Sequence, residues 1–118
     1  MEAEELKLRT KEFALDVIKI VQALPRTKTA EVLGRQLLRS ATSVGANYRA
    51  ACRARSKADF ISKIGVVEEE ADESAYWLEL LAEAKVVESK SVERLRSEAN
   101  ELLAIFTAAG RTAKQSLR

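Results

Sequence analysis

The sequence predicts an all-α protein, folded as a single antiparallel, up-down-up-down four-helix bundle over residues 1–118. Three observations predict this fold. Apolar residues recur every three or four positions in four separate segments. Only a few residues connect these segments, and short connections place neighbouring helices antiparallel. One proline and four glycines are too few for a turn-rich β-sandwich or barrel.

The first two helices are predicted over residues 5–24 and 29–53. Pro25 ends the first, because a proline disfavours helical geometry in the residue before it. Thr27 and Thr29 are alternative N-caps for the second. The apolar residues lie along one side of each helix; they are Phe13, Val17, Ile20 and Leu24, then Leu33, Leu37, Val44, Tyr48 and Ala51.

The last two helices are predicted over residues 56–87 and 91–110. Ser56 followed by Asp59 resembles a capping box and marks the start of the third helix. Gly110 predicts the end of the fourth helix, with a loosely held basic tail after it. The apolar stripes are Phe60, Ile64, Val67, Ala71, Leu78 and Ala82, then Val92, Leu95, Ala99, Leu102, Phe106 and Ala109.

Three glycines, Gly34, Gly45 and Gly65, lie inside predicted helices. A glycine at such a position costs about 0.5–1 kcal/mol relative to alanine. We interpret these glycines as sites where neighbouring helices approach closely, and a functional hinge is the alternative.

The composition argues against catalysis and against metal or cofactor chemistry. Histidine is absent, which removes the commonest general base and metal ligand. Cys52 is the only cysteine, so it can form neither an internal disulfide nor a cysteine zinc cluster. The acidic segment around Glu69 and Glu73 lacks the histidines of di-iron bundles. We therefore expect no catalytic residues, no metal, no cofactor and no small-molecule substrate.

The hydropathy pattern predicts a soluble, cytoplasmic protein that has no membrane partner. The longest apolar runs are only a few residues, far short of a membrane span. The first ten residues are charged and resemble no secretory signal.

The net charge of +2 conceals two oppositely charged regions. Residues 26–57 contain eight basic residues and one acid, whereas residues 59–88 contain nine acids and two basic residues. At about 100° per residue, four arginines fall on one stripe of the second helix, opposite its apolar side. This stripe consists of Arg35, Arg39, Arg49 and Arg53.

The arginine stripe, together with the adjoining Arg55, is the candidate nucleic-acid-binding surface. Arginine forks match phosphate geometry, so this surface predicts contact with RNA or DNA. No aromatic residue interleaves with the arginines, which predicts backbone contacts of low sequence specificity. The alternatives are a solvated face, or pairing with the acidic third helix of the same or a neighbouring subunit.

The third helix has an apolar flank beside its core stripe, where Val66 and Trp77 are joined by two leucines and two acids. This apolar face is wider than a helix needs for packing within a four-helix subunit, which predicts a homo-oligomer. The alternative is that Trp77 widens the internal core. The candidate oligomer-interface residues are Glu70, Glu73, Trp77, Leu80 and Leu81.

Three segments, at residues 39–47, 56–61 and 70–81, together resemble the 23S rRNA-intervening sequence protein family. Typical members show R-S-x-T/S-S-x-G-x-N, then a basic S-K/R-x-x-F-I segment, then E-A-x-E-x-x-Y-W-L-x-L-L. Here these segments read RSATSVGAN, SKADFI and EADESAYWLELL. The three occur in order at the expected spacing. Many members have Glu where this chain has Ala50, which makes the second helix more basic here.

The resemblance implies a bacterial, non-catalytic four-helix bundle. Related proteins include the accessory proteins of diversity-generating retroelements, which form barrel-like homopentamers with basic surfaces. A homo-oligomer, by resemblance a pentamer, that contacts RNA, DNA or a nucleoprotein is therefore expected. The alternative is a structural or adaptor protein whose charges serve self-assembly and protein–protein interaction without nucleic acid.

Overall fold

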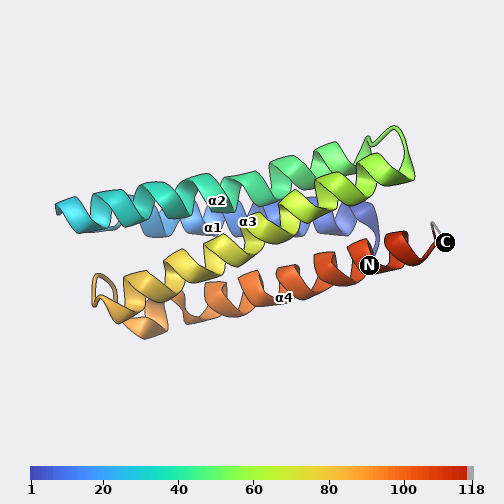
Figure 1. The fold of residues 1–118 in the computed structure, drawn as a ribbon. Coiled ribbons are helices and arrows are strands. Elements are labelled where there is room, and N and C mark those ends of the chain that lie inside the picture. The colour runs from blue at the N-terminus through green and yellow to red at the C-terminus, as the bar shows by residue number, and fades with distance from the viewer. Residues whose placement is uncertain (117–118) are drawn as a thin grey trace.

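The computed structural model describes residues 1–116, which form four α-helices packed as an elongated bundle (Figure 1). The helices are α1 (Ala3–Gln22), α2 (Lys28–Cys52), α3 (Lys57–Glu83) and α4 (Ser89–Gln115). The bundle measures 49 × 22 × 19 Å, and no strand occurs between residues 1 and 116. The predicted all-α four-helix bundle is confirmed.

Side chains cap the N-termini of the two middle helices. The Oγ1 atom of Thr27 accepts a hydrogen bond from the backbone N–H of Ala30 at 3.2 Å, so Thr27 rather than Thr29 caps α2. The Oγ atom of Ser56 accepts from the backbone N–H of Asp59 at 3.0 Å, as the predicted capping box requires. Each bond satisfies an amide that the helix itself leaves without a partner.

The third helix ends at Glu83, four residues before the predicted end at Val87. Lys85 has a φ of 60°, in the left-handed region, and so it cannot continue the helix. The backbone N–H of Val86 donates to the carbonyl oxygen of Leu81 at 3.0 Å and closes the helix end. The apolar periodicity continues through this turn, which is why the sequence misplaced the boundary.

The fourth helix continues past Gly110 to Gln115, so the predicted helix end at Gly110 is wrong. Gly110 is buried against α3, where a Cβ atom would lie 3.0 Å from Glu68 Oε1 and 3.3 Å from Ile64 Cγ2. This glycine therefore allows α3 and α4 to approach, rather than ending a helix. The predicted loose tail is helical as far as Gln115, and residues 117–118 lie outside the described part of the chain.

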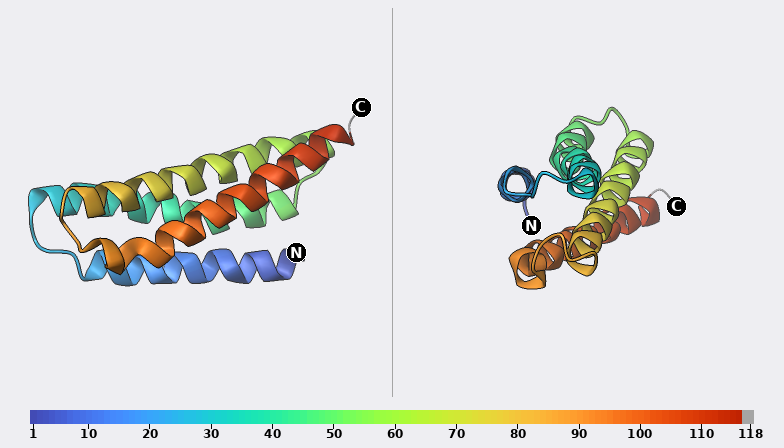
Figure 2. Two further views of the ribbon diagram at one scale, coloured as in Figure 1. Left: turned by 90° about the horizontal axis from the view of Figure 1, so that it is seen from below. Right: turned by 90° about the vertical axis from the view of Figure 1, so that its left-hand side faces the viewer.

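Helix α2 packs against both α1 and α3, and α3 packs against α4 (Figure 2). Helices α1 and α4 make few close contacts, and charged pairs also join them. Arg9 donates to both carboxylate oxygens of Glu98 at 2.6 and 2.7 Å. Arg94 Nη2 lies 3.1 Å from Asp16 Oδ2. These pairs add to the shared apolar core in linking α1 to α4.

Two of the three helical glycines occupy close approaches between helices, as predicted. A Cβ atom at Gly34 would lie 2.8 Å from Leu24 Cδ1, and one at Gly45 would lie 3.1 Å from Thr10 Oγ1. Gly65 differs, because no described atom lies within 4 Å of the place its Cβ would occupy. The cost of a helical glycine, about 0.5–1 kcal/mol, is therefore not offset at Gly65 by packing within the subunit.

The predicted apolar stripes meet in the core. Leu37, Leu78 and Phe106 are fully buried, and Phe13 is 2% exposed. The ring of Tyr48 packs against the ring of Phe106 with centroids 5.2 Å apart. This contact connects α2 with α4 across the bundle.

Tyr48 is expected to make the protein less stable in alkaline solution. Burial is the main cause that raises the pKa of its hydroxyl above the usual value of about 10. The folded protein keeps the neutral phenol, whereas the unfolded chain loses the proton above about pH 10. The free energy of unfolding should therefore fall as the pH rises above that value. Urea unfolding at neutral and alkaline pH should show a smaller loss for Tyr48→Phe, and equal losses would contradict the assignment.

The N-terminus, the α2–α3 connection and the last turn of α4 lie at the same end of the bundle (Figure 1). The Nζ atom of Lys57 donates to the Oγ atom of Ser116 at 2.7 Å, which joins the start of α3 to the end of α4. Three segments that are distant in sequence therefore lie at this end, and two of them are in contact there.

Candidate nucleic-acid interface

The arginines at the start of the α2 stripe have carboxylate partners. Arg35 Nη2 lies 3.2 Å from Glu31 Oε1, and both side chains are exposed. Arg39 reaches across to α3, where Nη1 lies 3.2 Å from Glu70 Oε2 and Nη2 binds Glu73. The Glu70 carboxylate is the main cause that raises the pKa of Arg39. The charge of the arginine stripe is thus partly neutralised by carboxylates of the same subunit. Such pairing with the third helix was one of the alternatives that the sequence left open.

Arg39 belongs to a polar contact between α2 and α3. The side chain of Glu70 is only 12% exposed, so Arg39 supplies the charge that this nearly buried carboxylate faces. Beside it, the hydroxyl oxygens of the buried residues Ser40 and Ser74 lie 3.1 Å apart. The Ser74 hydroxyl donates to the Glu70 carbonyl oxygen at 2.8 Å. Arg39 therefore helps to hold two helices together.

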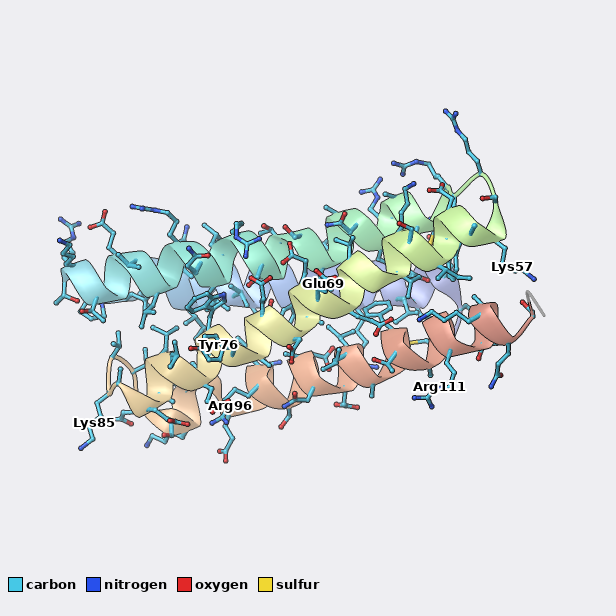
Figure 3. All side chains as sticks on the ribbon, in the orientation of Figure 1. Lys57, Glu69, Tyr76, Lys85, Arg96 and Arg111 are labelled. Atoms are coloured by element: carbon cyan, nitrogen blue, oxygen red, sulfur yellow. The ribbon has the colours of Figure 1, made fainter. Side chains whose placement is uncertain are left out.

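The remaining arginines form a positive surface at the end of α2, which we call the basic end. Arg49, Arg53 and Arg55 are exposed, and none of their guanidinium groups has a carboxylate within 4 Å among residues 1–116. The backbone N–H of Arg55 donates to Asp59 Oδ2 at 3.1 Å, so one carboxylate does lie at this end. Lys57, at the first turn of α3, lies at this end of the bundle (Figure 3). Lys114 comes from the last turn of α4, which the Lys57 side chain contacts. The basic end consists of these five residues.

Sequence reasoning included neither Lys57 nor Lys114 in the candidate surface. Lys57 follows Arg55 by only two residues and could have been included from the sequence, whereas Lys114 lies at this end because α4 packs antiparallel to α3. The acidic first turn of α1, with Glu4 and Glu5, lies at the same end of the bundle. Positive charge at this end therefore comes from α2, α3 and α4, but not from the first turn of α1.

An open groove of about 550 Å³ runs between α1 and α2. Its lining includes the small residues Gly45 and Ala46 together with Leu8, Lys11 and Arg49. Leu8 is 57% exposed, although it is a large apolar residue. The groove therefore combines a small-residue lining with positive charge and an accessible apolar side chain.

The candidate oligomer-interface residues lie at different depths. Leu81 is fully buried in the core of its own subunit and has no surface to offer another chain. Glu70 and Glu73 are engaged with α2. Trp77 and Leu80 are partly buried, and Trp77 packs against the subunit's own core. The indole N–H of Trp77 is buried without a hydrogen-bond partner among the described residues.

No group of three Asp, Glu or Cys side chains within residues 1–116 is placed to hold a metal ion. Over the same residues, none of the four helices combines the length and the apolar character that crossing a membrane requires.

Residues 4–108 match the sequence family described as 23S rRNA-intervening sequence protein. The chain belongs to this family. Its fold is similar to the crystal structure of a protein of unknown function from Bacteroides thetaiotaomicron, assigned to the S23 ribosomal protein family. The TM-score is 0.86 at 32% identity, over 94% of this chain and 99% of that chain. A comparison with curated proteins finds no match.

The structure gives physical reasons for several residues in the segments typical of 23S rRNA-intervening sequence proteins. Arg39 from the first segment pairs with Glu70 and Glu73 from the third, so the two segments form the α2–α3 polar contact. Asn47 donates to the carbonyl oxygen of Ser43 at 2.8 Å and thus bonds within its own helix. These residues stabilise the bundle of this family member, and the basic end lies largely outside them.

Proposed function

We propose that the protein is a non-catalytic member of its family that contacts the phosphate backbone of structured RNA or DNA through the basic end. The observation that carries the proposal is the exposure of Arg49, Arg53 and Arg55, whose guanidinium groups have no carboxylate partner among the described residues. Arg35 and Arg39 contribute less, because carboxylates already neutralise them. As the family resemblance implies, we place this activity in the bacterial cytoplasm.

The chemistry of the basic end supports contact with phosphate rather than with bases. Guanidinium groups bind phosphate oxygens with two parallel hydrogen bonds, and lysines add point charges. No exposed aromatic side chain of the described residues accompanies the basic end, since Tyr48 is buried, Phe60 packs against the core and Tyr76 lies far along α3. Recognition should therefore depend on the shape and charge of the nucleic acid and little on its sequence.

Binding is expected to weaken steeply with salt. The logarithm of the association constant should fall by about 0.9 per logarithmic unit of salt for each duplex phosphate neutralised. Fluorescence anisotropy with labelled RNA and DNA duplexes, over a series of salt concentrations, measures this slope. The double variant Arg53→Gln with Arg55→Gln should reduce the slope by about 2.

Arg35→Gln is the matched control, because it removes an exposed arginine of α2 that already has a carboxylate partner. This variant should bind almost as the wild type does. No binding to either duplex at about 50 mM salt, or an unchanged slope in the double variant, would overturn the proposal.

The second candidate function is a structural or adaptor role through self-assembly, with the pentamer of the family resemblance as the expected form. The observation that favours it is the exposure of large apolar side chains on several helices. Leu8 and Leu15 on α1, Val32 on α2, and Val66 and Tyr76 on α3 are each 40–57% exposed. Measuring the mass of the purified protein by light scattering tests this role.

A further inference from the structure

The outward side of α3 carries a glycine that its own subunit does not need. Gly65 lies in the middle of a 27-residue helix, with no described atom within 4 Å of the place its Cβ would occupy. Gly34, Gly45 and Gly110 each have a side chain from another segment of the same subunit at that position, within 2.8 to 3.1 Å. If a helix from outside the subunit packed at this position, Gly65 would allow it to approach closely.

The residues beside Gly65 form a surface suited to such a contact, which we call the α3 ridge. At about 100° per residue, Glu69, Asp72 and Tyr76 all lie within about 40° of Gly65 around the helix. Tyr76 is 52% exposed, and Val66, at the edge of the ridge, is 40% exposed. Figure 3 labels Glu69 and Tyr76 along the length of α3.

The α3 ridge is acidic, and its carboxylates form no ion pair among the described residues. Glu69 and Asp72 are exposed, and neither pairs with a cation among residues 1–116. Pairing two ridges about a two-fold axis would oppose these carboxylates to one another, which is unfavourable. The occupant of the ridge should therefore present positive charge.

The α1–α2 groove offers the complementary surface on the same chain. Lys11 and Arg49 line it, and neither has a carboxylate partner within residues 1–116. Ala46 is small and exposed, so it leaves room for side chains from another helix, and exposed Leu8 provides apolar contact. Helices α1 and α3 lie on opposite sides of α2 (Figure 2), so the ridge and the groove face different directions.

We propose that the α3 ridge of one copy docks into the α1–α2 groove of a second copy. The inference rests on the self-assembly in the proposed function and specifies the surfaces that form it. Carboxylates of Glu69 and Asp72 would lie against Lys11 and Arg49, while Tyr76 would pack against Leu8. Because two different surfaces meet, the contact is head-to-tail, and its repetition produces a closed ring or a filament.

Two variants that each block one surface test the proposal. Gly65→Gln fills the open position on the ridge, and Ala46→Gln places a larger side chain in the groove, where Ala46 is exposed. Each variant should fold, as circular dichroism will check, and each should weaken self-association about tenfold or more. Ala104→Gln, at an exposed position on α4 outside both surfaces, is the matched control and should retain the wild-type mass.

Mixing the two variants gives the decisive measurement. Gly65→Gln keeps an intact groove and Ala46→Gln keeps an intact ridge, so the mixture should form a two-chain complex that cannot grow. Light scattering should then detect twice the mass of one chain in the mixture and the mass of one chain in each variant alone. A monomeric wild type, a wild-type mass for either variant, or no complex in the mixture would overturn the proposal.

These measurements are independent of nucleic-acid binding. They use no nucleic acid, and they change none of the arginines or lysines of the basic end, of which only Arg49 also lines the groove. A failure of ridge-to-groove docking would therefore leave the nucleic-acid proposal standing. Conversely, absence of binding to duplexes would leave the expected masses unchanged.

Discussion

Phe106→Ala is expected to lower the free energy of unfolding by about 3–5 kcal/mol. The Phe106 side chain is fully buried in α4, and its ring packs on Tyr48 of α2 with a tilt of 43°. Truncation removes this contact and leaves a cavity that the surrounding helices can close only in part. No Cα atoms of α2 and α4 come within 8 Å of each other in the described residues, so side chains such as this ring make the contact between the two helices.

Urea unfolding followed by circular dichroism measures this loss. Leu103→Ala is the matched control, because Leu103 is one turn away on the same helix and only partly buried. Its loss should be clearly smaller. Small domains have a total stability of about 5–15 kcal/mol, so Phe106→Ala should remove a large share of it. A loss below about 1.5 kcal/mol would show that Phe106 does not join α2 to α4.

Arg39→Ala is expected to lower the free energy of unfolding by about 2 kcal/mol. The substitution leaves Glu70, whose side chain is 12% exposed, as a nearly buried carboxylate without its cation. Arg39 itself is 49% exposed, so the loss should be smaller than for a fully buried pair. Arg35→Ala, which removes an exposed pair within one helix, should change stability by less than about 0.5 kcal/mol.

A double variant identifies the cause of the Arg39 effect. If the unpaired carboxylate is responsible, adding Glu70→Gln to Arg39→Ala should recover part of the lost stability. Chemical unfolding of the two single variants and the double variant measures the coupling. An Arg39→Ala protein that is as stable as the wild type, yet binds duplexes more weakly, would return Arg39 to the phosphate-binding surface.

The sequence predicted the four helices because each helix of an elongated bundle buries one apolar stripe. Such a stripe appears in the sequence as apolar residues that recur every three or four positions. Thr27 and Ser56 could be recognised as capping residues from local spacing alone. Gly110 could not be interpreted in the same way, because a glycine near a helix end either stops the helix or admits a neighbour. Only the position of Glu68 on α3 shows which of the two applies.

The candidate surface was predicted less completely, because the partner of a charged side chain depends on how neighbouring helices are rotated. The spacing of the arginines placed Arg39 and Arg49 on one stripe. It could not reveal that Glu70 faces Arg39, whereas no described carboxylate reaches Arg49. The same limit applies to Leu81, whose spacing fits an exposed flank but whose side chain points into the core.

The arrangement of the chain ends affects how binding experiments should be built. Because an even number of antiparallel helices returns the chain to its starting end, the N-terminus and the end of α4 both lie near the α2–α3 connection. A purification tag or fluorophore fused to the N-terminus would start at the same end of the bundle as Arg53 and Arg55 and could obstruct a bound duplex. Labels attached at the α1–α2 or α3–α4 connection would be about 40 Å away, the length of a 27-residue helix.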